Sequence, residues 1–269
     1  MTVEVRRAAA AEVQAMRDLY RQEMNCQVRY DSMVGRGLAD PYLILIQGRV
    51  AGYGAMLNRY DPGRLMEFYA LPHVRGEALR MFRALLGASG ATHIAAQTND
   101  PSMLLMLYDC GRNIVTDSIL FHDAFRSDLP CPGGVFRRAA PGERGPDGED
   151  PDVQWVIEAG GAIVAGGGFL GHYNPPYADI YMSVAAAARR RGFGSYLVQE
   201  VKRVCYEAGR RPVARCNPDN AASRRTLEKA GLLPCGRVLV GEVAPDGGGG
   251  GGAGAVGAGG GDGGGTGGG

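Results

Sequence analysis

The order of helices and strands expected along this chain occurs twice, and this repetition limits the available folds more than any other feature of the sequence. Apolar residues with a period of two mark strands, those recurring every three to four residues mark helices, and Gly, Pro and Asp mark the ends. After an opening helix at 3–26, the first half is predicted to contain strands at 42–46, 50–57 and 65–71, a helix at 75–86, a strand at 93–97, a helix at 101–110 and a strand at 114–121. After an opening strand at 134–137, the second half is predicted to contain strands at 155–158, 162–170 and 178–184, a helix at 192–207, a strand at 212–216, a helix at 221–230 and a strand at 237–243.

Two landmarks keep nearly the same spacing in the two halves. Arg75 aligns with Arg189, and Gly111 aligns with Gly231. A constant period with the same element order indicates an internal duplication, although two unrelated halves of mixed α/β structure would also give this order by chance. We therefore expect an α/β (α+β) fold with two mixed, mostly antiparallel central sheets flanked by helices.

The chain divides into two predicted domains joined by a segment rich in Pro, Gly and Asp. The first domain is assigned to residues 1–128 and the second to residues 153–245. Residues 129–152 contain the linker and the first strand of the second domain. Residues 246–269 are almost all glycine, so they cannot bury apolar surface, and we expect this tail to be disordered.

The composition favours a soluble, cytoplasmic protein with one local basic region. The 29 basic and 28 acidic residues nearly cancel, so we expect neither a nucleic-acid nor a membrane partner. The six cysteines lack CxxC spacing, so we expect reduced thiols and no metal site. No run of residues reaches the apolar length of a membrane span. Basic residues gather between Arg189 and Lys229, which indicates a compact polyanion as the partner.

Residues 184–195 join a predicted strand to a predicted helix through the pattern Arg-x-x-Gly-x-Gly. Glycines let the backbone turn sharply and expose its N–H groups, and a helix start adds partial positive charge, so a diphosphate can bind there. The longer glycine fingerprint of dinucleotide-binding folds and the Gly-Lys-Ser/Thr of a P-loop are both absent. By itself the pattern would also suit a tight turn or close helix packing, so the surrounding sequence decides.

The surrounding sequence contains a second motif in a fixed order with the first. Asp-Ile-Tyr-Met-Ser-Val at 179–184 precedes the glycine pattern, and Asn-Pro-Asp-Asn at 217–220 leads to a helix closed by Lys-Ala-Gly-Leu at 229–232. In these respects residues 177–232 resemble the GNAT superfamily of acetyl-CoA-dependent N-acyltransferases. The resemblance implies two GNAT-like units, the second with the intact motif, and acetyl-CoA as the acyl donor.

The resemblance also implies a set of residues that bind acetyl-CoA. Met182 and Val184 lie on a strand that, in this family, splays from its neighbour and pairs with the pantetheine arm through exposed backbone groups. The residues that would hold the diphosphate are Arg189, Arg190, Arg191, Gly192, Phe193, Gly194 and Ser195. Asn220 and Ser223 would contact the pantetheine or its thiol end, although a helix cap and a solvated turn would also explain them.

For catalysis, the resemblance implicates Asp179 and Tyr181. A lysine-like ammonium has a pKa of about 10.4, roughly three units above neutrality, so attack on a thioester needs a base or a water chain leading to one. Relatives often carry a carboxylate base on the strand of Asp179, and Tyr181 would point to the same face; alternatively, Asp179 closes a turn or pairs with an arginine. The N–H of Met182 would stabilise the thioester oxygen. Many relatives use a tyrosine as general acid where this chain has Leu227, so Tyr181, Tyr196 or water would replace it, or the thiolate would leave unaided.

The loop before the splayed strand is where relatives receive the acyl acceptor. His172, Tyr173, Asn174 and Tyr177 lie in this loop and would line the acceptor pocket, or the Asn-Pro-Pro-Tyr turn would only fix the loop geometry.

The first half is expected to bind no acetyl-CoA. Ala78 and Arg80 stand where the second half has glycines, and their side chains would keep a pyrophosphate from the backbone. We expect this half to complete the acceptor cleft or to form the surface of a homodimer.

The resemblance therefore implies an N-acetyltransferase that moves an acetyl group from acetyl-CoA to a primary amine of a small molecule or peptide by direct attack. The alternative is a non-catalytic acyl-CoA-binding module with a regulatory or interaction role, which the loss of the usual tyrosine and the altered first half would explain.

Overall fold

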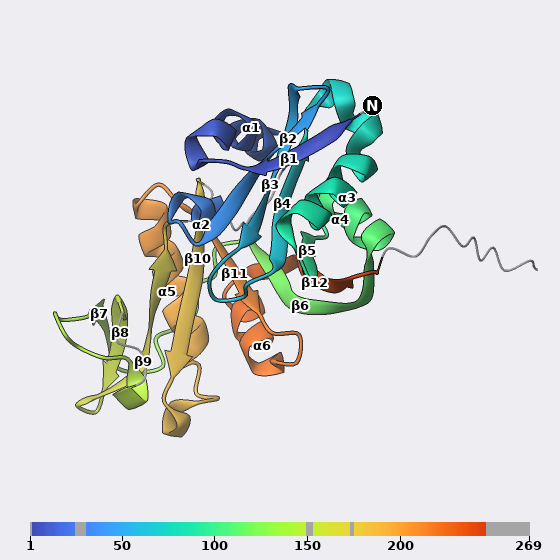
Figure 1. The fold of residues 1–269 in the computed structure, drawn as a ribbon. Helices are drawn as coiled ribbons and strands as arrows, with labels where there is room; N and C mark the ends of the chain where they lie inside the picture. The colour runs from blue at the N-terminus through green and yellow to red at the C-terminus, as the bar shows by residue number, and fades with distance from the viewer. Residues whose placement is uncertain (1, 25–30, 149–152, 173–174, 246–269) are drawn as a thin grey trace, which may run out of the picture.

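The computed structural model of the protein describes residues 2–24, 31–148, 153–172 and 175–245, and its fold is drawn in Figure 1. The strands are β1 (Val3–Arg7), β2 (Ala39–Ile46), β3 (Arg49–Leu57), β4 (Arg64–Ala70), β5 (His93–Gln97), β6 (Gly111–Asp123), β7 (Val135–Arg138), β8 (Trp155–Ala159), β9 (Ala162–Leu170), β10 (Tyr177–Val184), β11 (Arg211–Cys216) and β12 (Leu232–Val243). The helices are α1 (Ala10–Glu23), α2 (Asp31–Gly35), α3 (Ala78–Ser89), α4 (Pro101–Cys110), α5 (Phe193–Glu207) and α6 (Ala221–Lys229), with 3-10 turns η1 (Pro72–Glu77), η2 (Pro146–Gly148) and η3 (Ala186–Ala188). In the described part of the chain, no helix is long and apolar enough to cross a membrane.

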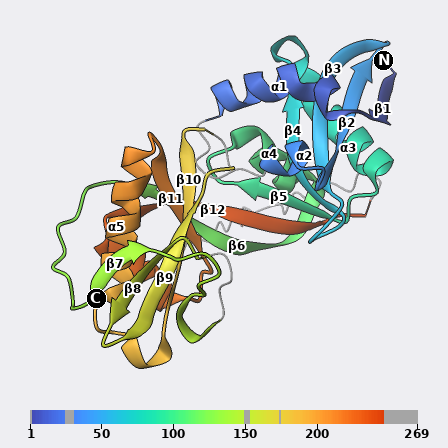
Figure 2. The ribbon, with the colours of Figure 1, turned by 90° about the vertical axis from the view of Figure 1, so that its left-hand side faces the viewer.

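The expected class, mixed α/β with a mostly antiparallel sheet flanked by helices, is confirmed, but the two expected sheets are joined into one. The sheet has 12 strands in the order β1-β2-β3-β4-β5-β12-β6-β11-β10-β9-β8-β7. The last strand of each half crosses to the other half, since β12 pairs with β5 and β6 pairs with β11 (Figure 2). Strands β6 and β12 are 13 and 12 residues long, which lets them pair with each other and still reach the far side. The domain boundaries at 1–128 and 153–245 stay predictions.

The start of the chain differs from the helix expected at 3–26. Val3 and Val5 alternate with charged residues, which is the period of a strand, and β1 pairs antiparallel with β2. The helix expectation is therefore wrong for residues 3–7, whereas α1 confirms it for residues 10–23. The short helix α2 has no counterpart in the sequence prediction.

The two faces of the sheet are covered differently in the two halves. In the first half, α3 and α4 pack on one face of the strands through a core that includes Ile44, and α1 packs on the opposite face against Leu43. In the second half, α5 and α6 pack on one face. On the other face the linker takes the place of a helix, because a Cβ at Gly166 of β9 would lie only 3.0 Å from Pro146 and 2.8 Å from Val153. Between β7 and β8 the described residues contain the turn η2 but no α-helix.

Strands β10 and β11 separate part of the way along their length. They pair in parallel over Tyr177–Ile180 and Arg211–Ala214, while β10 continues to Val184 paired with β9 alone. The end of β10 thus has an unpaired edge toward β11. Strands β4 and β5 also pair only at their beginnings, through Arg64–Leu65 and His93–Ile94.

A buried lysine of α5 holds the crossing strand β6 in the second half. The side chain of Lys202 is 2% exposed, and its ammonium donates to the carbonyls of Phe125 at 2.7 Å and Ala230 at 2.8 Å. It also forms an ion pair with Asp123, at the end of β6, with 2.8 Å between Nζ and Oδ1. One ammonium therefore joins β6, the chain that follows it, and the end of α6.

Candidate functional site

A cavity of about 760 Å³ lies where the unpaired end of β10, the start of α5 and helix α6 meet. Most of the residues predicted to bind the donor line it: Met182, Val184, Arg189, Arg190, Gly192, Gly194, Ser195, Asn220 and Ser223. The structure thus brings together residues from three elements that are separated along the chain.

The start of α5 is open to an anion in this cavity. Gly192 precedes the helix with a φ of 93°, and no side chain caps the helix there. The first N–H groups of a helix have no partner within the helix, so the amides of Phe193, Gly194 and Ser195 are available as donors. Arg190 also has a left-handed backbone, with a φ of 62°, which is uncommon for a residue with a side chain. This loop therefore combines exposed amides, a helix dipole and flanking guanidinium groups.

Gly194 lets three elements approach closely. A Cβ at this position would lie 3.2 Å from Cγ2 of Thr226 on α6 and 3.3 Å from Cγ2 of Val184 on β10. Any side chain here would push into the cavity wall or displace its neighbours, which explains why the loop ends in a second glycine.

Asn220 and Ser223 have a double role in the geometry. The side chain of Asn220 caps α6 by accepting a hydrogen bond from the N–H of Ser223 at 2.9 Å, which is the alternative considered for these residues. Both residues also line the cavity. The cap fixes them at its wall, and their contact with a donor stays a prediction.

Two of the residues predicted to bind the donor lie outside the cavity wall. Phe193 is 1% exposed in the core beneath α5, so only its backbone can serve the loop. The guanidinium of Arg191 lies over the Phe193 ring, with 5.3 Å between its Cζ and the ring centroid.

Sequence reasoning did not assign to the site three polar residues of α6 that line the cavity, namely Arg225, Thr226 and Lys229. They follow Ala222 and Ser223 at intervals of three or four residues, so they share one face of the helix. That periodicity was visible in the sequence, but the face it marks gains meaning only once α6 is placed beside the loop.

Asp179 is buried and paired with Arg215 of β11. Its Oδ2 accepts from Nε of Arg215 at 3.1 Å and from Nη2 at 2.8 Å. Burial raises the pKa of Asp179, and the positive charges of Arg215 and His172 oppose that rise. Pairing with an arginine, one of the alternatives for this residue, is what the structure shows, and its action as a base stays a prediction.

Tyr181 lies two residues beyond Asp179, on the sheet face opposite Met182 and Val184. A Cβ at Gly168 of β9 would lie 2.8 Å from the Tyr181 hydroxyl, so the glycine makes room for this side chain. The hydroxyl is therefore held against β9 on the face that carries Asp179.

The residues predicted to receive the acceptor differ in their placement. The exposed ring of His172 contacts Arg36 of the first half, with 3.3 Å between Nε2 and Nη1. Partial burial, and secondly the charge of Arg36, lower the pKa of His172. Tyr177 is buried at the start of β10, under the guanidinium of Arg211. Tyr173 and Asn174 lie outside the described residues.

The acetyltransferase (GNAT) family model matches residues 121–232, and all of the residues that line the cavity lie in this segment. Over this segment the chain is similar to the GNAT family, and this similarity supports an acyltransferase. No curated protein matches the sequence.

Solved structures extend the likeness of fold to both halves. A GNAT-family acetyltransferase from Colwellia psychrerythraea has 12% identity and a TM-score of 0.73, with 91% of this chain and 100% of that chain covered. A GCN5-related N-acetyltransferase from Sphaerobacter thermophilus has 18% identity and a TM-score of 0.58, with 90% and 96% covered. A tandem GNAT protein from the clavulanic acid biosynthesis pathway has 15% identity and a TM-score of 0.55, with 91% and 100% covered.

The GNAT segment has no hydroxyl at the position expected to hold a general acid. Leu227 is 2% exposed and packs in the core of the second half. Tyr196, one of the suggested substitutes, interacts with Cys131 of the linker and does not line the cavity. Burial is the main reason that the pKa of Tyr196 is raised.

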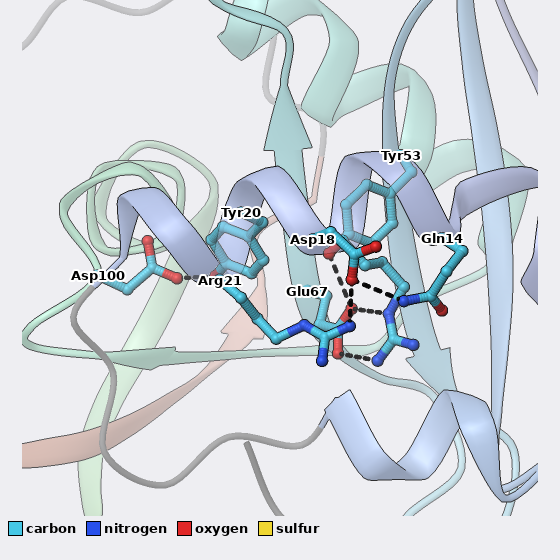
Figure 3. A network of polar contacts seen from close by, with 8 residues as sticks. Gln14, Asp18, Tyr20, Arg21, Tyr53, Glu67 and Asp100 are labelled. Atoms are coloured by element: carbon cyan, nitrogen blue, oxygen red, sulfur yellow. Dashed lines mark hydrogen bonds and ion pairs between the residues drawn. The ribbon is translucent and has the colours of Figure 1, made fainter. Parts of the chain in front are cut away.

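The first half has different side-chain contacts at the positions that correspond to the cavity of the second half. Arg75, the counterpart of Arg189, is tied to Glu23 of α1 and to the carbonyl of Ala70. Asp100 caps α4 as Asn220 caps α6, but it is only 2% exposed because Tyr20 of α1 points at it and donates a hydrogen bond to its carboxylate (Figure 3).

The same side of the first half is closed by a buried ion pair. Arg17 and Glu67 are 4% and 0% exposed, with 3.3 Å between Nε and Oε2. Tyr53 donates to the same Oε2 at 3.0 Å (Figure 3). Helix α1 thus fills this side of the first half with its own side chains. That this half binds no acetyl-CoA stays a prediction.

Proposed function

We propose that the chain is an N-acetyltransferase that moves an acetyl group from acetyl-CoA to a primary amine of a small molecule or peptide by direct attack. The observation that carries the proposal is the cavity at which the unpaired end of β10, the uncapped start of α5 and helix α6 meet, within the segment matched to the GNAT family.

The residues at this cavity fit an acyl-CoA donor. The exposed amides at the start of α5 and the guanidinium groups of Arg189 and Arg190 suit the diphosphate. The free edge of β10 at Met182 and Val184 suits the amide groups of the pantetheine arm, which would extend the sheet as another strand does. The thioester would then lie near the point where β10 and β11 separate.

In the proposed reaction, Asp179 takes the proton from the amine, directly or through water. Burial raises the pKa of its carboxyl, which makes it a stronger base, while the charge of Arg215 opposes that rise. The N–H of Met182 on the splayed strand would stabilise the negative charge that develops on the thioester oxygen. Tyr181, on the same face as Asp179, is the proposed proton donor to the leaving thiolate. A thiol has a pKa of about 8.5, so the thiolate also leaves readily without a proton donor.

The first half is proposed to complete the acceptor side. Its Arg36 reaches His172 of the second half, so the loop before β10 is held by residues from both halves. His172, Tyr173, Asn174 and Tyr177 remain the proposed acceptor-binding set.

A non-catalytic acyl-CoA-binding module with a regulatory or interaction role is the second candidate. Two observations favour it, the apolar Leu227 at the position of the usual acid and the engagement of Asp179 by Arg215.

Release of free thiol from acetyl-CoA, measured with a panel of primary amines and peptides, tests the proposal. We expect thiol release with at least one acceptor and an acetylated product by mass spectrometry. Asp179→Asn should lower kcat far more than it changes the Kd of acetyl-CoA. Binding of acetyl-CoA without turnover on any acceptor would support the second candidate, and no binding would refute both.

A further inference from the structure

The cavity wall carries positive charge from two separate elements. Arg189 and Arg190 belong to the loop before α5, whereas Arg225 and Lys229 belong to α6. Among the described residues that line the cavity there is no Asp or Glu. Four cations thus face one cavity without a protein carboxylate in its wall to balance them.

The two basic residues of α6 are set apart from their neighbours. Arg225 and Lys229 lie four residues apart, so they form one row on the cavity side of the helix. Their neighbours Arg224 and Glu228 pair with each other at 2.8 Å and do not line the cavity. Neither Arg225 nor Lys229 forms an ion pair within the described residues. The helix therefore neutralises one row of charges internally and presents the other row to the cavity.

A diphosphate alone does not account for this second row. The loop amides and the two loop arginines already provide donors for it at the start of α5. A second anionic group, held at a distance from the diphosphate, is the ligand that Arg225 and Lys229 fit. The ribose 3′-phosphate of CoA is such a group.

We propose that Arg225 and Lys229 bind the 3′-phosphate of CoA and make the chain discriminate against 3′-dephospho-CoA. This inference rests on the proposed use of an acyl-CoA donor. A phosphate accepts charge-assisted hydrogen bonds from guanidinium and ammonium groups, and these bonds are stronger than neutral ones. Since both side chains are exposed, solvent weakens each contact, and we expect a preference of about tenfold to fiftyfold that shrinks as the salt concentration rises.

Isothermal titration of the full chain with CoA and with 3′-dephospho-CoA tests the proposal. The wild type should bind CoA about tenfold or more tightly than dephospho-CoA. The double variant Arg225→Gln/Lys229→Gln should lose this preference through weaker CoA binding, with its affinity for dephospho-CoA unchanged. Arg224→Gln, on the same helix but outside the cavity, is the matched control and should keep the preference.

A loop variant separates the two phosphate positions. Arg190→Gly removes a loop cation, and glycine suits the left-handed backbone at this position. The variant should therefore bind CoA and 3′-dephospho-CoA more weakly by a similar factor. Equal affinity of the wild type for both nucleotides would overturn the assignment of the 3′-phosphate and leave the proposed function intact. Equal weakening of both nucleotides by the double variant would do the same. Failure of the wild type to bind either nucleotide would overturn the proposed function together with this inference.

Discussion

Replacing Lys202 by methionine should destabilise the whole chain, because this residue holds the crossing strand in place. The ammonium is 2% exposed and has three acceptors, two backbone carbonyls and the carboxylate of Asp123. Removing one partner of a buried ion pair costs about 3–5 kcal/mol. Asp123 is 18% exposed and keeps the hydroxyl of Tyr206 as a donor at 2.8 Å, so we expect the lower end, about 3 kcal/mol. Methionine retains much of the apolar stem, so little of this loss comes from packing.

Equilibrium unfolding in urea, followed by far-UV circular dichroism and by the fluorescence of the single tryptophan, Trp155, measures this loss. Arg203→Met is the matched control, since Arg203 is the next residue on α5 and is 52% exposed in its ion pair with Glu200. An exposed pair of this kind contributes about 1 kcal/mol or less. Adding Asp123→Asn to Lys202→Met should cost little further stability, because it removes the orphaned charge. A loss for Lys202→Met no larger than that of the control would refute the anchoring role.

Three further predictions concern the donor site, the base and the first half. Gly194→Ala places a Cβ 3.2 Å from Thr226 and 3.3 Å from Val184, so acetyl-CoA should bind about tenfold more weakly by calorimetry while the helix keeps its stability; unchanged affinity would contradict the close fit. Arg215→Gln removes the charge that opposes the raised pKa of Asp179, so that pKa should rise further and the acid limb of kcat/KM should move to higher pH; an unmoved limb would exclude Asp179 as the base. The hydrogen bond from Tyr69 and the charge of Arg75 lower the pKa of Glu23, so its contribution to stability is present above the unfolded pKa and is lost as the pH falls. Glu23→Gln should therefore be less stable than wild type at neutral pH, with the difference disappearing in acid; a constant difference would rule out an ionic origin.

The loop within residues 184–195 could be predicted from the sequence because its signals are local. Gly192 allows the left-handed backbone before α5, and Gly194 allows the close approach to Val184 of β10. Both requirements arise within one short segment. The cap at Asn220 is likewise local, since its partner is three residues away. By contrast, Arg225 and Lys229 belong to the basic region that indicates a polyanion, but their place in the cavity wall is evident only when α6 is seen beside the loop. The contact of Arg36 with His172 joins residues that are far apart along the chain, and no periodicity predicts it.

The strand at the start of the chain was missed for a different reason. β1 is only 5 residues long, and the strongly periodic α1 follows within a few residues. Its pairing with β2 is a long-range contact, and it outweighs the local tendency to extend the helix.

The crossing of β6 and β12 could not be predicted from the sequence, since the two halves have the same element order and the local patterns of their last strands suit either position. Only the long-range pairing decides, with β6 beside β11 over Ile119–His122 and β12 beside β5 over Val238–Glu242. A chain cut between the halves would leave β5 and β11 without these partners and expose two sheet edges. Strand β11 in turn carries Arg215, which holds Asp179, and diverges from β10 at the cavity. The first half therefore supports the proposed donor site through β6, although it is expected to bind no donor itself.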